Sequence, residues 1–248
     1  DSELTLDAEN NTSGLDRDYA TAWSYGIQET LSLMIPNVKG GGNARISENE
    51  KALDKVDRNV RSIVGNFDHY WGKQPFTAGP VYVGAFVFFL FILSLFVLKG
   101  PMKWGLLAAT IFSILLAWGS NFMPFTDLVL DYLPGYNKFR TVSMALVIAE
   151  VTIPLMAFLA LAKIIREPAV VRERMKTFYI SLGLTAGVIL LLIALPELFL
   201  NFTKPDEAGI FTNWRNSGAT PRQVAEVREN LLQARLSIFR QEAWRSLL

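Results

Sequence analysis

Four long apolar segments constrain the fold of this 248-residue chain more than any other feature. They cover residues 81–98, 104–123, 142–165 and 178–200. A helix rises about 1.5 Å per residue, so segments of this length can cross the roughly 30 Å hydrocarbon core of a bilayer. Apolar residues make up 51% of the chain and gather in these segments, as in membrane proteins. The sequence therefore predicts an all-α fold, a polytopic transmembrane helical bundle with four spans and helical extracytoplasmic loops.

Basic residues predict the orientation of the four spans. Lys99 and Lys103 lie between the first two spans, and Lys163 and four further basic residues flank or occupy the 166–177 connection. By the positive-inside rule, these two connections are cytoplasmic. Residues 1–80, 119–141 and 201–248 are then extracytoplasmic. Within them, 124–141 is predicted to be an interfacial segment, and 201–248 a loop followed by an amphipathic helix.

Local patterns predict the elements between the spans. We expect a short helix over 16–35, a flexible break at 39–43, and an amphipathic helix that begins with a capping box at 47–50 and continues to Phe67. Thr126 is predicted to cap a brief helix over 126–133. Thr220, followed by Pro221 and Gln223, predicts the start of the C-terminal helix.

Small residues predict two helix contacts inside the membrane. Ala109, Ser113 and Ala117 recur every four residues in the second span, and Gly183 and Gly187 form a GxxxG pattern in the fourth. Small side chains at this spacing let two helix backbones approach closely. We therefore expect both stripes to face neighbouring helices.

Composition excludes several functional classes. The chain has no cysteine, so it has no disulfide, thiolate metal site or cysteine nucleophile. The net charge is +1, which gives no argument for nucleic-acid binding. His69 is the only histidine and is interpreted as a turn residue. We expect no metal site, and we interpret the chain as an internal piece of a longer protein.

Glu150 is the unusual charge of the third span. A carboxylate at this depth costs about 2.5–3.5 kcal/mol on insertion scales, so it marks a functional hypothesis. It could carry a proton, bind a cation or pair with a basic residue of another helix. Alternatively, it is hydrogen-bonded between helices, near the backbone carbonyl that Pro154 leaves free.

Lys138 and Arg140 lie in the polar turn before the third span, beside Tyr136. Two cations and a phenol at the outer membrane surface could bind a lipid phosphate. Alternatively, both cations extend toward the headgroups, as basic residues do at the ends of many spans.

Two further pairs have a functional and a structural interpretation. Asp127 and Asp131 are four residues apart and could hold Mg²⁺ or share acid–base work, or Asp127 could simply complement a helix dipole. Trp23 and Glu29 could contact a sugar or acceptor by stacking and hydrogen bonding, or they could contribute to helix packing.

Several segments together resemble a known family. They are Ala20-Thr-Ala-Trp-Ser-Tyr-Gly-Ile-Gln-Glu-Thr-Leu continuing to Ile35-Pro-Asn, Tyr70-Trp-Gly-Lys-Gln-Pro-Phe-Thr-Ala-Gly-Pro-Val-Tyr-Val-Gly84, Asn121-Phe-Met-Pro-Phe and Leu133-Pro-Gly-Tyr-Asn-Lys-Phe-Arg140. In this order they resemble the YfhO family of bacterial polytopic membrane proteins, in the form typical of Bacteroidetes.

The resemblance implies a glycosyltransferase of the GT-C type in the bacterial cytoplasmic membrane. Such enzymes move a sugar from a polyprenyl-phosphate donor to a cell-envelope acceptor. Their catalytic acid lies in the first extracytoplasmic loop, expected upstream of this chain, so no catalytic residue is assigned here. Expected partners are the lipid bilayer, the polyprenyl-phosphate sugar and further helices of the same full-length protein. No cofactor is expected in these residues, whereas the full-length protein could use a divalent cation.

Two rival functions stay open at this point. The first is a transporter or flippase in which Glu150 is the proton or ion site. The second is a non-catalytic protein of envelope assembly whose loops bind partners.

Overall fold

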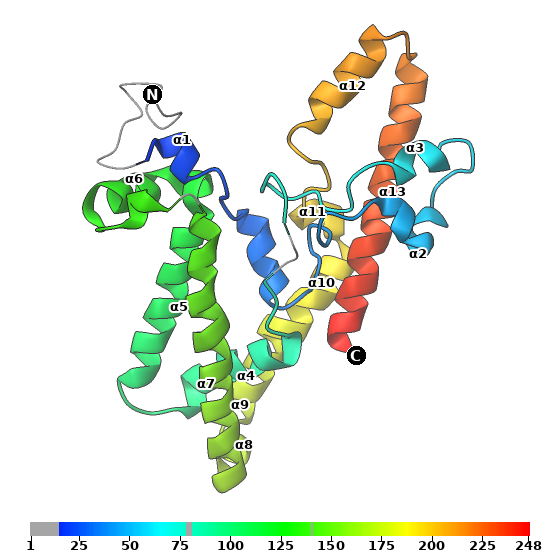
Figure 1. Ribbon diagram of the computed structural model, residues 1–248. Helices are drawn as coiled ribbons and strands as arrows, with labels where there is room; N and C mark the ends of the chain where they lie inside the picture. The colour runs from blue at the N-terminus through cyan, green and yellow to red at the C-terminus, as the bar shows by residue number, and fades with distance from the viewer. Residues whose placement is uncertain (1–14, 78–80, 140) are drawn as a thin grey trace. The chain divides into compact units, whose positions relative to one another are not determined.

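The computed structural model describes residues 15–77, 81–139 and 141–248. These residues form helices and connecting loops, and their only β-structure is two isolated bridges (Figure 1). The chain divides into two compact units. Unit 1 comprises Asp1–Met34 and Val81–Gly187, and unit 2 comprises Ile35–Pro80 and Val188–Leu248. The predicted extracytoplasmic region 1–80 is thus shared between the two units.

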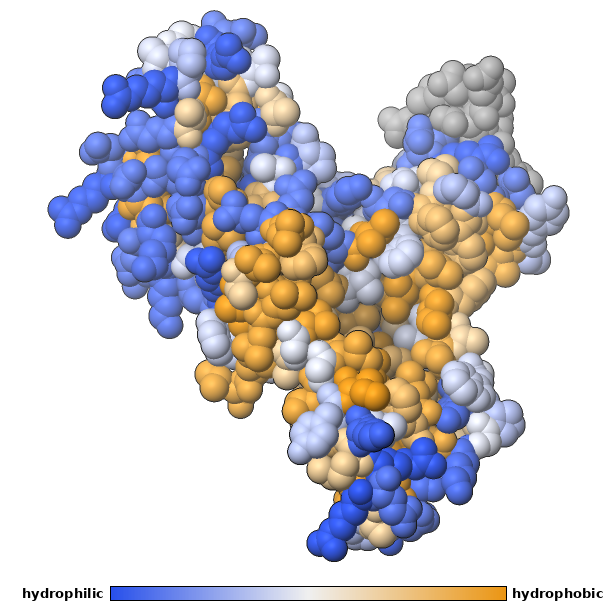
Figure 2. Space-filling view, turned by 180° about the vertical axis from the view of Figure 1, so that it is seen from behind, coloured by the Kyte–Doolittle hydropathy of each residue, from blue (hydrophilic) through white to orange (hydrophobic). Residues whose placement is uncertain are grey.

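Three helical stretches are long and apolar enough to cross a membrane: Met102–Tyr132, Val142–Arg166 and Met175–Ala194. The surface of unit 1 is correspondingly hydrophobic over much of its length, and hydrophilic residues gather toward its ends (Figure 2). Four spans were expected. The first apolar segment instead forms α4 (Ala85–Val97), a helix of 13 residues that rises only about 20 Å. Residues 81–84 are not helical, and Gly84 has a positive φ of 99°.

Each long stretch combines several helical elements. Met102–Tyr132 contains α5 (Met102–Trp118), η3 (Gly119–Phe122) and α6 (Met123–Tyr132). Val142–Arg166 begins as the 3₁₀-helix η5 (Val142–Leu146) and continues as α7 (Val147–Arg166). Met175–Ala194 contains α9 (Met175–Leu182), the π-helix η6 (Gly183–Gly187) and α10 (Val188–Ala194).

Helix α7 packs against both α4 and α5, and α4 also contacts α9. Ser113 is completely buried at the contact between α5 and η5–α7, where its hydroxyl donates to the Ala145 carbonyl at 2.8 Å. Ala117 is equally buried. The small-residue stripe of the second span therefore permits close helix packing, as predicted.

The predicted GxxxG contact is absent from the described residues. A Cβ atom added at Gly183 or Gly187 would meet no atom within 4 Å there. The two glycines lie in the π-helix and are exposed.

Basic side chains bind backbone carbonyls at one end of unit 1. The Lys103 ammonium donates to the carbonyls of Leu95 and Leu98 at 2.6 and 2.9 Å. These carbonyls lie at the C-terminal end of α4 and have no partner inside the helix. Arg174, which follows the short helix α8 (Ala169–Glu173), donates to the Phe96 carbonyl at 3.0 Å. The basic loops thus also satisfy backbone groups.

Residues 16–35 form two short helices where one was expected. These are α1 (Arg17–Ala20), capped by the Asp16 carboxylate, and the 3₁₀-helix η1 (Ile27–Leu33). The predicted cap at Thr126 is wrong, because α6 begins three residues earlier. The Thr126 hydroxyl instead donates to the Gly119 carbonyl at 2.7 Å and closes the bend between α5 and α6.

Unit 2 contains η2 (Ile46–Glu48), α2 (Glu50–Leu53), α3 (Arg61–Gly65), α10, α11 (Pro196–Phe199), α12 (Glu207–Asn216) and α13 (Pro221–Leu247). The amphipathic helix expected over 47–67 is broken between α2 and α3. Asn230 of α13 explains the break, because its side chain binds both the backbone N–H and the carboxylate of Asp57, at 2.7 and 3.2 Å.

Helix α13 confirms the helix predicted to begin at Thr220, whereas the loop expected before it contains α12 (Glu207–Asn216). The Thr220 hydroxyl accepts from the Gln223 N–H at 3.3 Å, and the Gln223 side chain accepts from the Thr220 N–H at 2.9 Å. This capping box begins a helix of 27 residues. The predicted apolar face is buried within unit 2 by contacts with α2, α3, α10 and α12.

Candidate functional site

One group of polar residues in unit 1 lies where residues 15–34 contact the predicted outer ends of α5 and α7. The Tyr25 N–H donates to the Ala117 carbonyl at 2.7 Å, and the Ser120 N–H donates to the Ser24 hydroxyl at 2.8 Å. The Asn121 amide donates to the Tyr25 carbonyl at 3.0 Å. Residues 15–34 are therefore bound to the end of the α5 helix. We call residues 15–34, 119–122, 133–139 and 141–146 the outer layer.

The polar turn at 133–141 belongs to the same outer layer. The Leu15 N–H donates to the Asn137 carbonyl at 2.9 Å, and the Ser143 N–H donates to the Trp23 carbonyl at 3.3 Å. These bonds join sequence-distant segments that contain four of the predicted site residues: Trp23, Glu29, Tyr136 and Lys138.

Position 119, at the bend of the outer layer, requires glycine. Gly119 has a positive φ of 45°, and a Cβ atom there would lie 2.2 Å from the Ser24 hydroxyl oxygen. Only glycine combines this backbone conformation with so little space. The bend is thus determined by the tertiary contact with residues 15–34.

The predicted lipid-phosphate residues differ in what they can offer a ligand. Lys138 lies at the end of η4 (Tyr136–Lys138) and is exposed. The Tyr136 hydroxyl donates to the Leu116 carbonyl at 2.7 Å, so its proton is already engaged. Burial raises the pKa of this phenol. Arg140 lies outside the described residues, and Lys138 is an exposed cation of the described turn.

The predicted sugar-contact residues differ in the same way. Trp23 is half-buried, whereas Glu29 is only 5% exposed. The Glu29 carboxylate accepts from the Gly26 N–H at 3.2 Å, which completes the start of η1. Burial, together with the negative charge of Glu29, raises the pKa of the Tyr25 hydroxyl. Glu29 therefore supports the outer layer, and Trp23 is the better placed of the two to meet a ligand.

Asp127 and Asp131 have a structural role, but not the predicted one, because α6 begins at Met123 and Asp127 therefore lies beyond its first turn. Arg17 donates to both carboxylates, each at 3.1 Å. One guanidinium thus bridges two acids that are one turn apart on α6. The contacts of Arg17 with the two carboxylates thus join α1 to α6. No group of three potential metal ligands occurs in the part of the chain that the structure describes.

Glu150 lies in the first turn of α7, and its residue is exposed. An acid in this position interacts favourably with the helix dipole. Pro154, one turn later, removes the backbone N–H that would otherwise bond to the Glu150 carbonyl. The functional and the structural role of this carboxylate both stay predictions.

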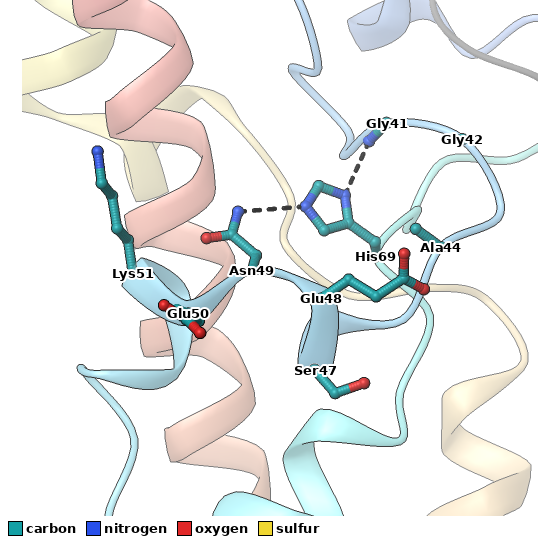
Figure 3. A pocket seen from close by; sticks show the side chains of 9 residues that line it. All are labelled: Gly41, Gly42, Ala44, Ser47, Glu48, Asn49, Glu50, Lys51 and His69. Carbon is teal, nitrogen blue, oxygen red and sulfur yellow. Dashed lines mark hydrogen bonds between the residues drawn. The ribbon is translucent and has the colours of Figure 1, made fainter.

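A second polar site, which the sequence did not reveal, surrounds His69 in unit 2 (Figure 3). It is an open cleft of about 740 Å³. Its lining combines backbone, hydroxyl, amide, carboxylate, ammonium and imidazole groups. The lining residues are Gly41, Gly42, Ala44, Ser47, Glu48, Asn49, Glu50, Lys51 and His69. We call this site the His69 cleft.

Backbone pairing places the imidazole in this cleft. The His69 N–H donates to the Ala44 carbonyl at 2.9 Å, and the Trp71 N–H donates to the Lys39 carbonyl at 2.8 Å. Gly40 has a φ of 78°, and a Cβ atom there would lie 1.8 Å from the His69 carbonyl oxygen. The glycine run at 40–42 was expected to be a flexible break, but Gly40 and Gly41 are buried and paired.

One hydrogen bond and one close polar contact orient the His69 ring. Its Nδ1 accepts from the Gly41 N–H at 3.0 Å, and its Nε2 lies 3.5 Å from the Asn49 amide nitrogen. Burial lowers the pKa of His69 and keeps the ring neutral, although the Glu48 charge opposes this effect. Because His69 and its glycine partner are 28 residues apart, no local motif could have revealed the cleft.

Comparison with known proteins gives no assignment for either site. No family model matches the chain, and neither a curated protein nor a solved structure matches it.

Proposed function

We propose that the chain is part of a polytopic bacterial cytoplasmic-membrane protein that transfers a sugar from a polyprenyl-phosphate donor to a cell-envelope acceptor. One observation supports the proposal most strongly: residues 15–34, 133–139 and 141–146 form one hydrogen-bonded layer at the predicted outer ends of apolar helices. With the predicted orientation, this layer lies at the headgroup level, where a lipid-linked phosphate is presented. The resemblance to the YfhO family supplies the reaction.

Lys138 is the proposed contact for the donor phosphate. It is exposed in a turn that the Tyr136 hydroxyl binds to the end of α5 through the Leu116 carbonyl, and that the Asn137 carbonyl binds to the Leu15 N–H. Phe139 beside it is 67% exposed, so the turn offers an apolar and a cationic group together. Such a pair suits a phosphate that is attached to a polyprenyl chain.

The proposed reaction is a displacement at the anomeric carbon. The acceptor hydroxyl oxygen forms a bond to that carbon, and the bond from the carbon to the phosphate oxygen breaks. The phosphate leaves with the electron pair, and Lys138 stabilises its charge. The hydroxyl proton passes to a carboxylate outside this chain, so no residue here is assigned as the base.

Binding of tritiated undecaprenyl phosphate to the protein in nanodiscs tests the proposal. We expect Lys138→Gln to weaken binding about fivefold, because one cation near a membrane surface contributes about 1 kcal/mol. Lys99→Gln is the matched control, since Lys99 is also exposed but precedes α5, whereas Lys138 follows α6. Equal affinities for Lys138→Gln and the native protein would overturn the assignment, as would equal losses for both variants.

A parallel measurement separates the transporter alternative. If Glu150→Gln abolishes a proton-coupled flux in proteoliposomes while sugar transfer is unchanged, the transferase proposal fails. If transfer depends on Lys138 and no flux is carried, the transferase proposal is supported.

A further inference from the structure

The His69 cleft presents two hydrogen-bond donors that lack a suitable acceptor. Neutral histidine has one N–H, and the Gly41 N–H bond to Nδ1 requires that nitrogen to be unprotonated. The ring proton is therefore on Nε2. The Asn49 amide nitrogen lies 3.5 Å from it and, with this tautomer, is also a donor.

The orientation of the Asn49 side chain is fixed by its role as a helix cap. Its amide oxygen accepts from the Ala52 N–H at 3.1 Å at the start of α2. The amide therefore cannot turn its oxygen toward His69 without losing the cap. Figure 3 shows the imidazole and the amide nitrogen of Asn49 facing each other in the cleft. An oxygen atom from a ligand could accept from both groups.

Charge decides which class of oxygen ligand fits. Glu48 and Glu50 line the cleft together with Lys51, so with a neutral His69 the lining carries one net negative charge. Phosphate and carboxylate ligands are repelled by this charge.

We propose that the His69 cleft binds a neutral polyhydroxylated ligand, a sugar unit. A hydroxyl group can accept from His69 Nε2–H or from the Asn49 amide while it donates to a carboxylate of the lining. Several hydroxyls on one ring match the alternation of donors and carboxylates. The volume of about 740 Å³ lies within the range of small-molecule sites.

This inference deepens the proposed function and rests on it for the ligand's role as the acceptor sugar. The binding itself does not depend on the donor-phosphate contact at Lys138. Failure of Lys138→Gln to affect undecaprenyl-phosphate binding would therefore leave sugar binding at His69 to be decided by its own measurement.

The single histidine makes a direct test possible. The full chain, labelled with ¹⁵N,¹³C-histidine and held in nanodiscs, gives one set of ring resonances. Methyl β-D-glucopyranoside is the neutral probe, inorganic phosphate the anionic probe and cyclohexanol the apolar probe. We expect the glycoside alone to shift the His69 resonances, saturably and in the millimolar range.

Glu50→Gln is the variant, because its carboxylate lines the cleft and is exposed. We expect about fivefold weaker glycoside binding, with unshifted His69 resonances before addition as proof of an intact site. Glu226→Gln, outside the cleft in the same unit, should bind as the native protein does. A shift caused by phosphate alone, equal shifts from glycoside and cyclohexanol, or no shift at about 50 mM glycoside would each overturn the proposal.

Discussion

Removing the charge of Glu207 should increase the local unfolding of helix α13. Arg235 and Glu207 form a bidentate ion pair in unit 2, with one contact at 2.9 Å between Nη1 and Oε2. Their side chains are only 1% and 6% exposed. Arg235 also donates to the Phe202 carbonyl at 2.7 Å and lies over the Trp71 ring, 5.4 Å from its centroid. The guanidinium is therefore enclosed on several sides.

The expected cost follows from this enclosure. Glu207→Gln preserves the shape of the side chain but leaves a buried guanidinium without a counter-charge, which typically costs about 3–5 kcal/mol. The double variant Glu207→Leu with Arg235→Met removes both charges. This double variant should be more stable than Glu207→Gln. It should still be about 1–3 kcal/mol less stable than the native protein, because the Phe202 carbonyl loses its donor.

Hydrogen exchange measured by mass spectrometry reports this opening locally. In nanodiscs, peptides from the middle of α13 should exchange more than about a hundredfold faster in Glu207→Gln, since about 1.4 kcal/mol corresponds to a factor of ten. Arg245→Ala is the control, because the Arg245 and Glu242 pair on the same helix has one side chain 77% exposed. Native-like exchange in Glu207→Gln would refute the conclusion that this pair is desolvated.

Four further outcomes are expected. Gly40→Ala should destabilise unit 2 by more than about 2 kcal/mol and displace the His69 resonance, because the new Cβ would meet the His69 carbonyl. An NMR titration should find the pKa of His69 below 6.5. As the pH drops below 6.5, the unfolded chain then binds more protons than the folded chain. The free energy of unfolding should therefore fall as the pH drops from 6.5 to the lowered pKa. His69→Gln should make the free energy of unfolding less dependent on pH in this range. Thr220→Ala should cost about 1 kcal/mol and increase exchange at the start of α13, where the cap is lost. Ser113→Leu should lower the thermal midpoint by an amount equivalent to about 1–3 kcal/mol, because a larger side chain would separate α5 from α7, whereas Ser217→Leu on the exposed surface should not.

The sequence predicted those features that depend on neighbouring residues. The capping box at Thr220 sets the start of α13, and hydrophobic runs determine the three long apolar helices. Ser113 was found through its four-residue spacing, which is itself a local pattern. In each case the energetic cause lies within one or two helical turns.

Contacts between distant residues explain what the sequence did not predict. Apolar spacing favours one helix over 47–67, yet Asn230, 173 residues away from Asp57, binds the break between α2 and α3. Similarly, Thr126 is a residue type that often caps helices, but its hydroxyl binds the Gly119 carbonyl at the bend between α5 and α6. His69 appeared to be a lone turn residue until the fold brought Gly41 and Asn49 to its ring.

The two candidate sites differ in the charge that they offer a ligand, and this difference supports a division of tasks within the proposed reaction. The outer layer presents the cation Lys138 beside the exposed ring of Phe139, a combination suited to an anionic lipid. The His69 cleft presents neutral donors among carboxylates, a combination that disfavours anions and suits hydroxyl groups. A phosphate bound preferentially in the cleft would therefore contradict the assignment of the His69 cleft, whereas the Lys138 assignment is decided by its own binding measurement. Selectivity for phosphate at Lys138 and for a neutral glycoside at His69 is the pattern expected if both proposals hold.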